Sequence, residues 1–257
     1  FIQQGEVCDV FQRLHQRFGF SRIFAHEETG NALTYRRDRR LANWAQGAGV
    51  ALKESPQNGV VRRLEDRDGW SKVWESRMSQ AITLPARKIG GPMLSDGDVQ
   101  IPSSESLGLI RTERVPQLQG GESDGLRVLE SFAMGRGTRY HREMSSPNTA
   151  FDSCSRLSPY LTWGCLSMRT AVQRIRAAAG DTLPKIAARA FLSRCHWHCH
   201  FIQKLESEPA IEFCAFNRAC ETLRDNGNDP ARLEAWQQGR TGDPFVDACM
   251  RALKKRG

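Results

Sequence analysis

Two serine hydroxyls three positions apart are the first chemical feature of this chain. Residues 153–169 read SCSRLSPYLTWGCLSMR, a polar start that leads into an apolar segment. One helical turn would place the hydroxyls of Ser155 and Ser158 on the same face. Hydroxyls and exposed backbone N–H groups at the start of a helix are the donors that a phosphate needs. The residues therefore predict that Ser155 and Ser158 cap a helix and form a phosphate-binding turn, and a capped helix without a ligand is the alternative.

A second chemical feature is the run CHWHCH at residues 195–200, which holds three of the six histidines. On a helix Cys195 and Cys199 share a face, as do His196 and His200. Thiolate and imidazole are the ligand types that zinc prefers. A single helix cannot wrap four ligands tetrahedrally around one ion, so we expect no metal here. Pocket lining and ordinary helix packing are the two other interpretations.

The serine segment resembles the flavin-phosphate loop of the photolyase/cryptochrome family, whose usual form is T-S-R-L-S-P-Y-L followed by a G-x-L-S-x-R helix. Residues 234–253, EAWQQGRTGDPFVDACMRAL, resemble the family segment W-x-x-G-x-T-G-Y-P-x-V-D-A-x-M-R-x-L. The resemblance is clearest over residues 125–257 and looser over 20–77. The opening W-F-R-x-D-L-R strand, the W-x-H-N-R helix and the D-x-D…N segment of the family have no counterpart. We therefore expect an internal fragment, truncated at both ends.

The resemblance implies a set of FAD-binding residues in this chain. Ser155 and Ser158 would contact the flavin pyrophosphate through their hydroxyls, and Leu157 would contact it through its backbone. Tyr140 falls where the family places a tyrosine that covers the cofactor. One departure weakens this set, because Cys154 replaces the usual threonine and a thiol donates hydrogen bonds poorly.

The resemblance also assigns the cysteine–histidine segment to the family's E-L-x-W-R-E/D-F-Y helix, which lines the flavin and lesion pockets. Trp197 falls on the tryptophan that stacks against the DNA lesion. His198 replaces the arginine that pairs with the flavin phosphates, so its charge depends on pH. Arg194 replaces the glutamate that contacts the lesion bases, and this reversal of charge favours phosphate or a different base edge.

The elements that position these residues begin with an α/β pattern. Residues 7–18 have helical spacing of apolar positions, and Arg22–Ala25 read as a short strand. Thr34 is expected to cap a helix that runs to Gly47, and a second strand follows at Val50–Leu52. Alternating helices and strands are typical of a parallel sheet.

The helix that follows Thr34 carries the charged run RRDRR at residues 36–40. Its four arginines are expected on the outward side of the helix. This pattern is typical of a solvated helix face that Asp38 partly compensates. Phosphate binding is the alternative.

Prolines and glycines interrupt residues 56–122, apart from an amphipathic piece at Gly69–Met78 with two tryptophans. From Gly121 onward the apolar period is helical, without strand-like alternation. We predict a partial Rossmann-like α/β antenna domain, joined by a long linker to an all-α FAD-binding domain that is incomplete at its C-terminus. The predicted boundaries are 1–57 for the antenna domain, 58–122 for the linker and 123–257 for the FAD-binding domain.

Composition limits the class of protein. The formal net charge is +8, which favours a polyanionic partner or an anionic membrane surface. No run of apolar residues is long enough to span a membrane. The eight cysteines are scattered through apolar helical patterns, which indicates free buried thiols in a reducing cytosol. We therefore expect a cytoplasmic monomer.

The resemblance implies a light-dependent flavoprotein that binds FAD, with an antenna chromophore (folate or deazaflavin) in the N-terminal domain. The leading hypothesis is a DNA photolyase, a carbon–carbon lyase that repairs UV pyrimidine dimers in DNA by photoinduced electron transfer. The positive charge and Trp197 favour this hypothesis, whereas Arg194 and Cys154 oppose standard dimer repair. A cryptochrome-type blue-light photoreceptor without repair and an inactive truncated copy are the alternatives. No catalytic residue is assigned.

Overall fold

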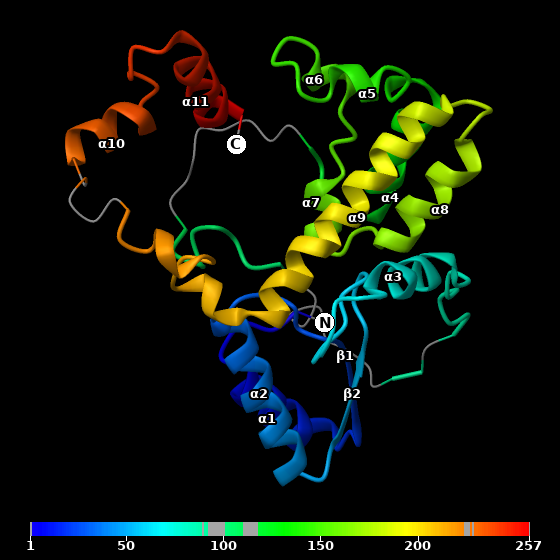
Figure 1. Cartoon of the computed structure of the whole chain (residues 1–257). Coiled ribbons are helices and arrows are strands. Elements are labelled where there is room, and N and C mark those ends of the chain that lie inside the picture. The colour runs from blue at the N-terminus through cyan, green and yellow to red at the C-terminus, as the bar shows by residue number, and fades with distance from the viewer. Residues whose placement is uncertain are drawn as a thin grey trace. The chain divides into compact units, whose positions relative to one another are not determined.

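The computed structural model describes residues 2–88, 90–91, 101–109, 118–223, 227 and 229–256. The chain divides into two compact units (Figure 1). The α/β unit comprises Phe1–Thr112 and Cys199–Glu212, and the helical unit comprises Glu113–His198 and Phe213–Gly257. The elements are α1 (Val7–Phe18), β1 (Arg22–His26), α2 (Ala32–Gly47), β2 (Ala51–Ser55), α3 (Trp70–Ser79), α4 (Glu122–Ser131), the π-turn η2 (Phe132–Arg136), α5 (Tyr140–Glu143), α6 (Ala150–Ser153), α7 (Ser158–Thr162), α8 (Met168–Ala178), α9 (Lys185–Ser207), the 3-10 turns η3 (Pro209–Glu212) and η4 (Arg218–Cys220), α10 (Pro230–Gln237) and α11 (Pro244–Arg256).

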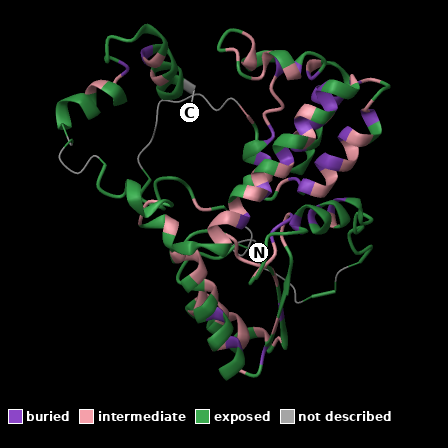
Figure 2. Cartoon of the chain, in the orientation of Figure 1, coloured by how far each residue is buried: buried purple, intermediate pink, exposed green. Residues whose placement is uncertain are grey.

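The α/β unit is built on a parallel pair of strands. β1 pairs with β2 in a register that sets Arg22 opposite Ala51 and His26 opposite Ser55. The connection between these parallel strands is α2, so the predicted strand–helix–strand order is confirmed. The small core of this part consists of buried residues from both kinds of element (Figure 2), namely Ile23, Leu41, Ala45 and Val50.

The ends of the first two helices follow from their capping residues. Glu6 accepts a hydrogen bond from the N–H of Val7 at the start of α1, and Gly19 ends that helix with φ 62°. The side chain of Asn31 caps α2 by accepting from the N–H of Thr34 at 3.1 Å. The prediction that Thr34 is the cap was therefore wrong, because its own hydroxyl donates back to Asn31.

Helix α3 lies inside the predicted linker and is anchored by its apolar side. Trp70, Trp74 and Met78 recur every four residues and are buried, as the spacing of the two tryptophans predicts. A Cβ on Gly59 would lie 2.0 Å from Cδ1 of Trp74, so only glycine fits at this contact. The indole N–H of Trp70 donates to the carbonyl of Gly59 at 2.9 Å.

The C-terminal part of α9, from Cys199 onward, belongs to the α/β unit and holds the backbone next to Gly59. Gln203 is fully buried, and its amide accepts from the N–H of Val61 at 2.7 Å and donates to the carbonyl of Val61 at 2.9 Å. One side chain thus satisfies both backbone groups of a residue that lies 142 positions earlier.

The helical unit contains no strand among its described residues, which confirms the predicted helical character after Gly121. An isolated bridge between Ala179 and Leu183 closes the turn from α8 to α9. Fully buried side chains come from α4, η2 and α8 and from that turn, namely Leu129, Phe132, Ile175 and Leu183.

The predicted domain boundaries stay predictions after this description. The boundaries 1–57, 58–122 and 123–257 are not tested, and parts of the predicted linker, residues 89, 92–100 and 110–117, lie outside the described residues.

Within the part of the chain that the structure describes, no helix has the length and apolar character to cross a membrane. All eight cysteines are free thiols, but only Cys195 and Cys199 are buried, so the expectation of generally buried thiols was wrong.

Candidate functional site

The predicted phosphate-binding turn is the loop between α6 and α7. Ser158 is the first residue of α7, and Leu157 occupies the capping position without a side-chain hydrogen bond. The prediction that the two serines cap this helix was therefore wrong. Pro159 follows Ser158 and has no N–H for a cap to bind. The hydroxyl of Ser155 instead accepts from the N–H of Leu157 at 3.5 Å, a weak contact.

The carbonyls of this loop are held by Arg136, which ends the π-turn η2. Its guanidinium donates to the carbonyl of Cys154, to that of Ser155 at 3.1 Å and to that of Val128 at 3.3 Å. The same group lies 5.7 Å from the ring centre of Phe132. Burial lowers the pKa of Arg136, but a guanidinium stays protonated in a protein. We call these contacts the Arg136 clamp.

The clamp determines where the N–H groups of the loop point. In a trans peptide the N–H is directed opposite to the carbonyl, so the N–H groups of Ser155 and Arg156 point away from Arg136. Among the described residues, no acceptor is hydrogen-bonded to either group. Arg156 has φ 57°, a left-handed conformation that is uncommon outside glycine. Successive backbone N–H groups around such a residue form a concavity that binds anions.

Tyr140 packs against two aromatic rings of the helical unit. Its ring centre is 5.3 Å from that of Phe132 and 6.2 Å from that of Phe191, and both contacts are edge-to-face. Burial, with a smaller contribution from nearby Cys154, raises the pKa of Tyr140 to about 12, so its phenol is neutral at physiological pH. Leu157 is also buried, with 1% of its surface exposed.

The structure brings Arg194 and Trp197 together on α9. The guanidinium carbon of Arg194 lies 6.0 Å from the ring centre of Trp197, within the range of a cation–π contact. Trp197 is 51% exposed, although large aromatic side chains are usually buried. An exposed aromatic ring beside a cation can stack a base and attract a phosphate.

His198 differs from its neighbours because its Nδ1 atom is buried without a hydrogen-bond partner among the described residues. Burial lowers its pKa, so the ring is neutral at physiological pH. An orphaned buried ring nitrogen is costly unless a ligand satisfies it. No hydrogen bond of the described residues joins His198 to the loop at Ser155.

These observations fit a dinucleotide with a pyrophosphate and do not indicate a metal centre. The loop offers two outward N–H groups and the hydroxyls of Ser155 and Ser158 as donors. His198 offers a buried nitrogen that a polar ligand would satisfy. Among the described residues, no group of three or more His, Cys, Asp or Glu side chains is arranged to hold an ion. The expected absence of metal at Cys195 and Cys199 stays a prediction.

Sequence reasoning missed the residue that organises the loop. Arg136 stands between two glycines, directly after the apolar residues 132–134. A charged residue at the end of an apolar segment was the available signal for its role. The left-handed backbone of Arg156 has no signal in residue type. Like His198, His141 has a buried Nδ1 without a hydrogen-bond partner among the described residues. A single histidine on a short helix gave no sign of this in the sequence.

The conserved-domain comparison covers the last quarter of the chain. Residues 191–257 match the family described as the FAD binding domain of DNA photolyase. This match includes Arg194, Trp197 and His198 but not the loop at Ser155.

Curated relatives and solved structures extend the likeness to the whole chain. Cryptochrome-2 of Gallus gallus is 26% identical over 100% of this chain and 48% of its own length. Cryptochrome DASH of Natronomonas pharaonis is 26% identical, with 100% and 57% covered. A bacterial class III photolyase from Agrobacterium tumefaciens has a TM-score of 0.80 at 20% identity, covering 98% of this chain and 54% of that protein. A cryptochrome from Synechocystis sp. PCC6803 has a TM-score of 0.71 at 21% identity, with 98% and 55% covered.

The chain spans about half the length of the relatives it matches. Its flavin-type loop is followed at the family's distance by the W-x-x-G-x-T-G segment, and the domain match lies in the same region. The sequence relatives and the fold agree with both motifs. Residues 191–257 thus match the FAD binding domain of DNA photolyase, and the whole chain is similar in sequence and in fold to members of the photolyase/cryptochrome family.

Proposed function

We propose that the protein binds FAD at the loop formed by Ser155, Leu157 and Ser158, with His198 as a further phosphate contact and Tyr140 beside the cofactor. The observation that carries the proposal is the Arg136 clamp. Because Arg136 occupies the loop carbonyls, the backbone N–H groups are left for an anion. FAD, when bound, supplies light-driven one-electron chemistry, which protein side chains cannot provide.

We propose further that the substrate is UV-damaged DNA and that the reaction is light-dependent repair of pyrimidine dimers. The half-exposed ring of Trp197 would stack on a base, an interaction worth roughly 1–3 kcal/mol. Arg194 beside it would contact a phosphate and thereby orient the strand. The class III photolyase from Agrobacterium tumefaciens shares the fold, which supports this choice.

The second candidate function is a cryptochrome-type photoreceptor without repair. It is favoured by Arg194, which replaces the carboxylate expected to contact lesion bases with a cation. Several of the curated relatives are also cryptochromes, at 24–26% identity. In this case flavin photochemistry would alter binding to a protein partner.

The first experiment measures bound flavin in the purified full chain by its absorbance. Ser155→Ala combined with Ser158→Ala should weaken flavin binding by about 100-fold or more, because two lost hydrogen bonds to a charged group cost roughly 1.5–3 kcal/mol each. Ser167→Ala, which removes the cap of α8, is the matched control and should leave flavin content unchanged. Equal flavin content in the double variant and the wild type would contradict the site.

The second experiment separates repair from signalling. The flavin-loaded protein is illuminated with dimer-containing DNA, and restored bases are counted for wild type, Trp197→Ala and Arg194→Glu. Repair that requires light and Trp197 supports a photolyase. Flavin photoreduction without repair, with equal affinity for damaged and undamaged DNA, supports a cryptochrome.

We also propose that the protein binds an antenna pigment (folate or deazaflavin), is a monomer and is located in the cytoplasm.

A further inference from the structure

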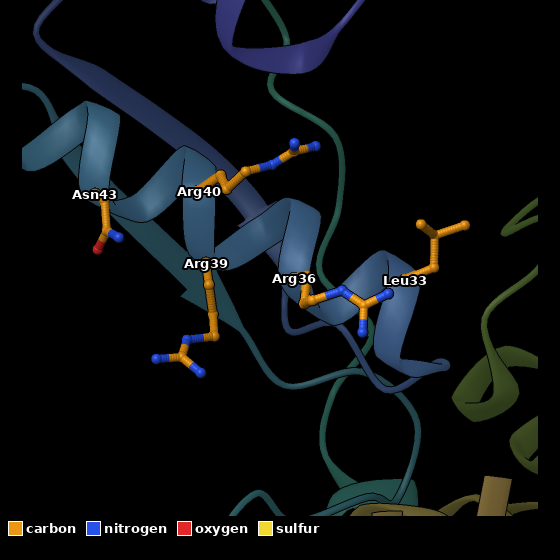
Figure 3. Close-up of a pocket in the computed structure, with 5 residues that line it drawn as sticks. All are labelled: Leu33, Arg36, Arg39, Arg40 and Asn43. Carbon is orange, nitrogen blue, oxygen red and sulfur yellow. The ribbon is translucent and has the colours of Figure 1, made fainter. Parts of the chain in front are cut away.

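One side of α2 carries exposed side chains that the core does not use. The opposite side of this helix buries Leu41 and Ala45 against the strands. The exposed side lines a shallow groove of about 350 Å³ (Figure 3). We call it the α2 arginine face, and its residues are Leu33, Arg36, Arg39, Arg40 and Asn43.

The charge of this face is only partly compensated. Two carboxylates near this helix, Glu28 and Asp38, both pair with Arg37, at 2.9 and 2.7 Å. Within the described part of the chain, no carboxylate forms an ion pair with Arg36 or Arg39. The sequence interpretation, a solvated face compensated by Asp38, therefore applies to Arg37 and not to these two arginines.

Arg40 is the member of the face that has a partner. Its guanidinium pairs with Glu6, whose other carboxylate oxygen accepts from the N–H of Val7 at the start of α1. Both side chains are exposed, and exposed ion pairs contribute little free energy, so a stronger anion can displace this one.

The direction of the side chains indicates the shape of the ligand. In Figure 3 the guanidinium groups of Arg36, Arg39 and Arg40 point apart instead of converging on one point. From Leu33 to Asn43 the face runs about 15 Å along the helix, at roughly 1.5 Å per residue. Divergent cations in a row fit several phosphates of an extended polyanion better than one phosphate ion.

We propose that the α2 arginine face binds the phosphate backbone of duplex DNA without sequence preference, as a contact additional to Trp197. The choice of DNA rests on the proposed function, while the polyanion character rests on the charges. An anionic membrane fits less well, because Leu33 is the one large apolar side chain of the face and the apolar side of α2 is buried. The formal net charge of +8 agrees with a polyanionic partner.

The test measures dark binding of the full chain to undamaged duplex DNA at several salt concentrations. Arg36→Gln, Arg39→Gln and Arg40→Gln together should flatten the salt dependence by up to about 2.7 in the slope of log K against log salt. Three lost contacts correspond to a roughly 40-fold smaller fall in affinity between about 50 and 200 mM salt. Lysine at the same three positions should retain the slope.

The matched control removes three arginines from other surfaces. Arg127, Arg218 and Arg232 are exposed and pair with acidic residues three positions away in the sequence. Changing them to glutamine lowers the net charge equally, and the salt slope should stay at the wild-type value. Equal slopes in the two triple variants would overturn the proposal, because the effect would then follow net charge alone.

Two further results separate this inference from its alternatives. Vesicles that contain phosphatidylserine should bind equally to wild type and the α2 variant, and selective loss of vesicle binding with unchanged DNA binding would overturn the proposal. Trp197→Ala should keep the salt slope on undamaged DNA. If flavin binding or repair fails while the α2 dependence remains, the proposed function is wrong and this inference stands.

Discussion

Arg136 in the helical unit and Gln203 in the α/β unit each hold a backbone segment that lies outside their own helix. Gln203 satisfies both the N–H and the carbonyl of Val61, so neither group needs a ligand. In the loop, Arg136 binds the carbonyls of Cys154 and Ser155 and leaves the N–H groups of Ser155 and Arg156 unbound among the described residues. An amide side chain thus completes a structural contact, whereas a purely donating side chain leaves a backbone that can bind an anion.

The largest effect that distinguishes the two contacts is expected at Arg136. Arg136→Met removes the two charged hydrogen bonds to the loop as well as those to Val128 and Ser131. At roughly 1.5–3 kcal/mol for each of the two loop bonds, the unfolding free energy should fall by about 3–6 kcal/mol or more. Flavin should be lost from the variant as well, because the loop peptides are free to turn. Urea unfolding and flavin absorbance measure the two effects. Retained flavin in a folded Arg136→Met protein would show that the clamp does not orient the loop.

A smaller effect, on stability alone, is expected at Gln203. Gln203→Leu leaves the N–H and carbonyl of half-buried Val61 without partners, which costs about 2–4 kcal/mol at roughly 1–2 kcal/mol for each group. Under conditions where the variant is folded, its flavin affinity should match that of the wild type. Loss of flavin without loss of stability would contradict the comparison.

The third prediction concerns the pH dependence of the apo-protein. Burial lowers the pKa of His198 in the folded chain, so the unfolded chain binds the additional proton near the ordinary histidine pKa of about 6.5. The stability contributed by the neutral ring is therefore present at higher pH and is lost as the pH falls below about 6.5.

Urea unfolding of wild type and His198→Gln, at pH values above and below about 6.5, measures how much stability His198 contributes. The difference in stability between the two proteins should shrink toward acid pH. Bound FAD should reverse the trend in the wild type, because phosphate stabilises the protonated ring. A difference that is independent of pH in both states would contradict the assignment of His198.

The smallest effect is expected at Cys154. Burial raises the pKa of this thiol, so it is protonated and has only a weak contact with the carbonyl of Met144, at 3.7 Å. Cys154→Thr restores the hydroxyl that the family has at this position and should strengthen flavin binding by about 0.5–1.5 kcal/mol. Titration of the apo-protein with FAD measures the change, with Cys165→Ser as a control. A loss of affinity would show that the thiol is preferred here.

The sequence predicted the elements well where one period dominates. Residues 23–25 and 50–52 are short apolar runs, and Leu41 and Ala45 recur with the helical period, so the strand–helix–strand order could be derived. The same reasoning failed at α2, because Asn31 and Thr34 are both good caps and only the backbone decides between them.

The candidate site was predictable only in the residues that carry a recognisable motif. Ser155, Ser158 and Trp197 could be named from their spacing and resemblance. Arg136 could not be named in this way, because its role depends on a contact between η2 and the carbonyl of Cys154, which lies 18 positions later. Such a contact depends on tertiary packing, which residue type and spacing do not encode locally.

The contact between Val61 and Gln203 has a consequence for the order of events during protein synthesis. The α/β unit is discontinuous in sequence, so the ribosome must add 142 further residues before the partner of Val61 exists. At roughly 5–20 residues per second this interval lasts roughly 7–28 s. During that time the strands β1 and β2 can form, but the segment at Gly59 and Val61 stays incomplete. A nascent chain stalled before Gln203 should therefore be cleaved by protease near Val61, while a chain stalled well beyond α9 should resist.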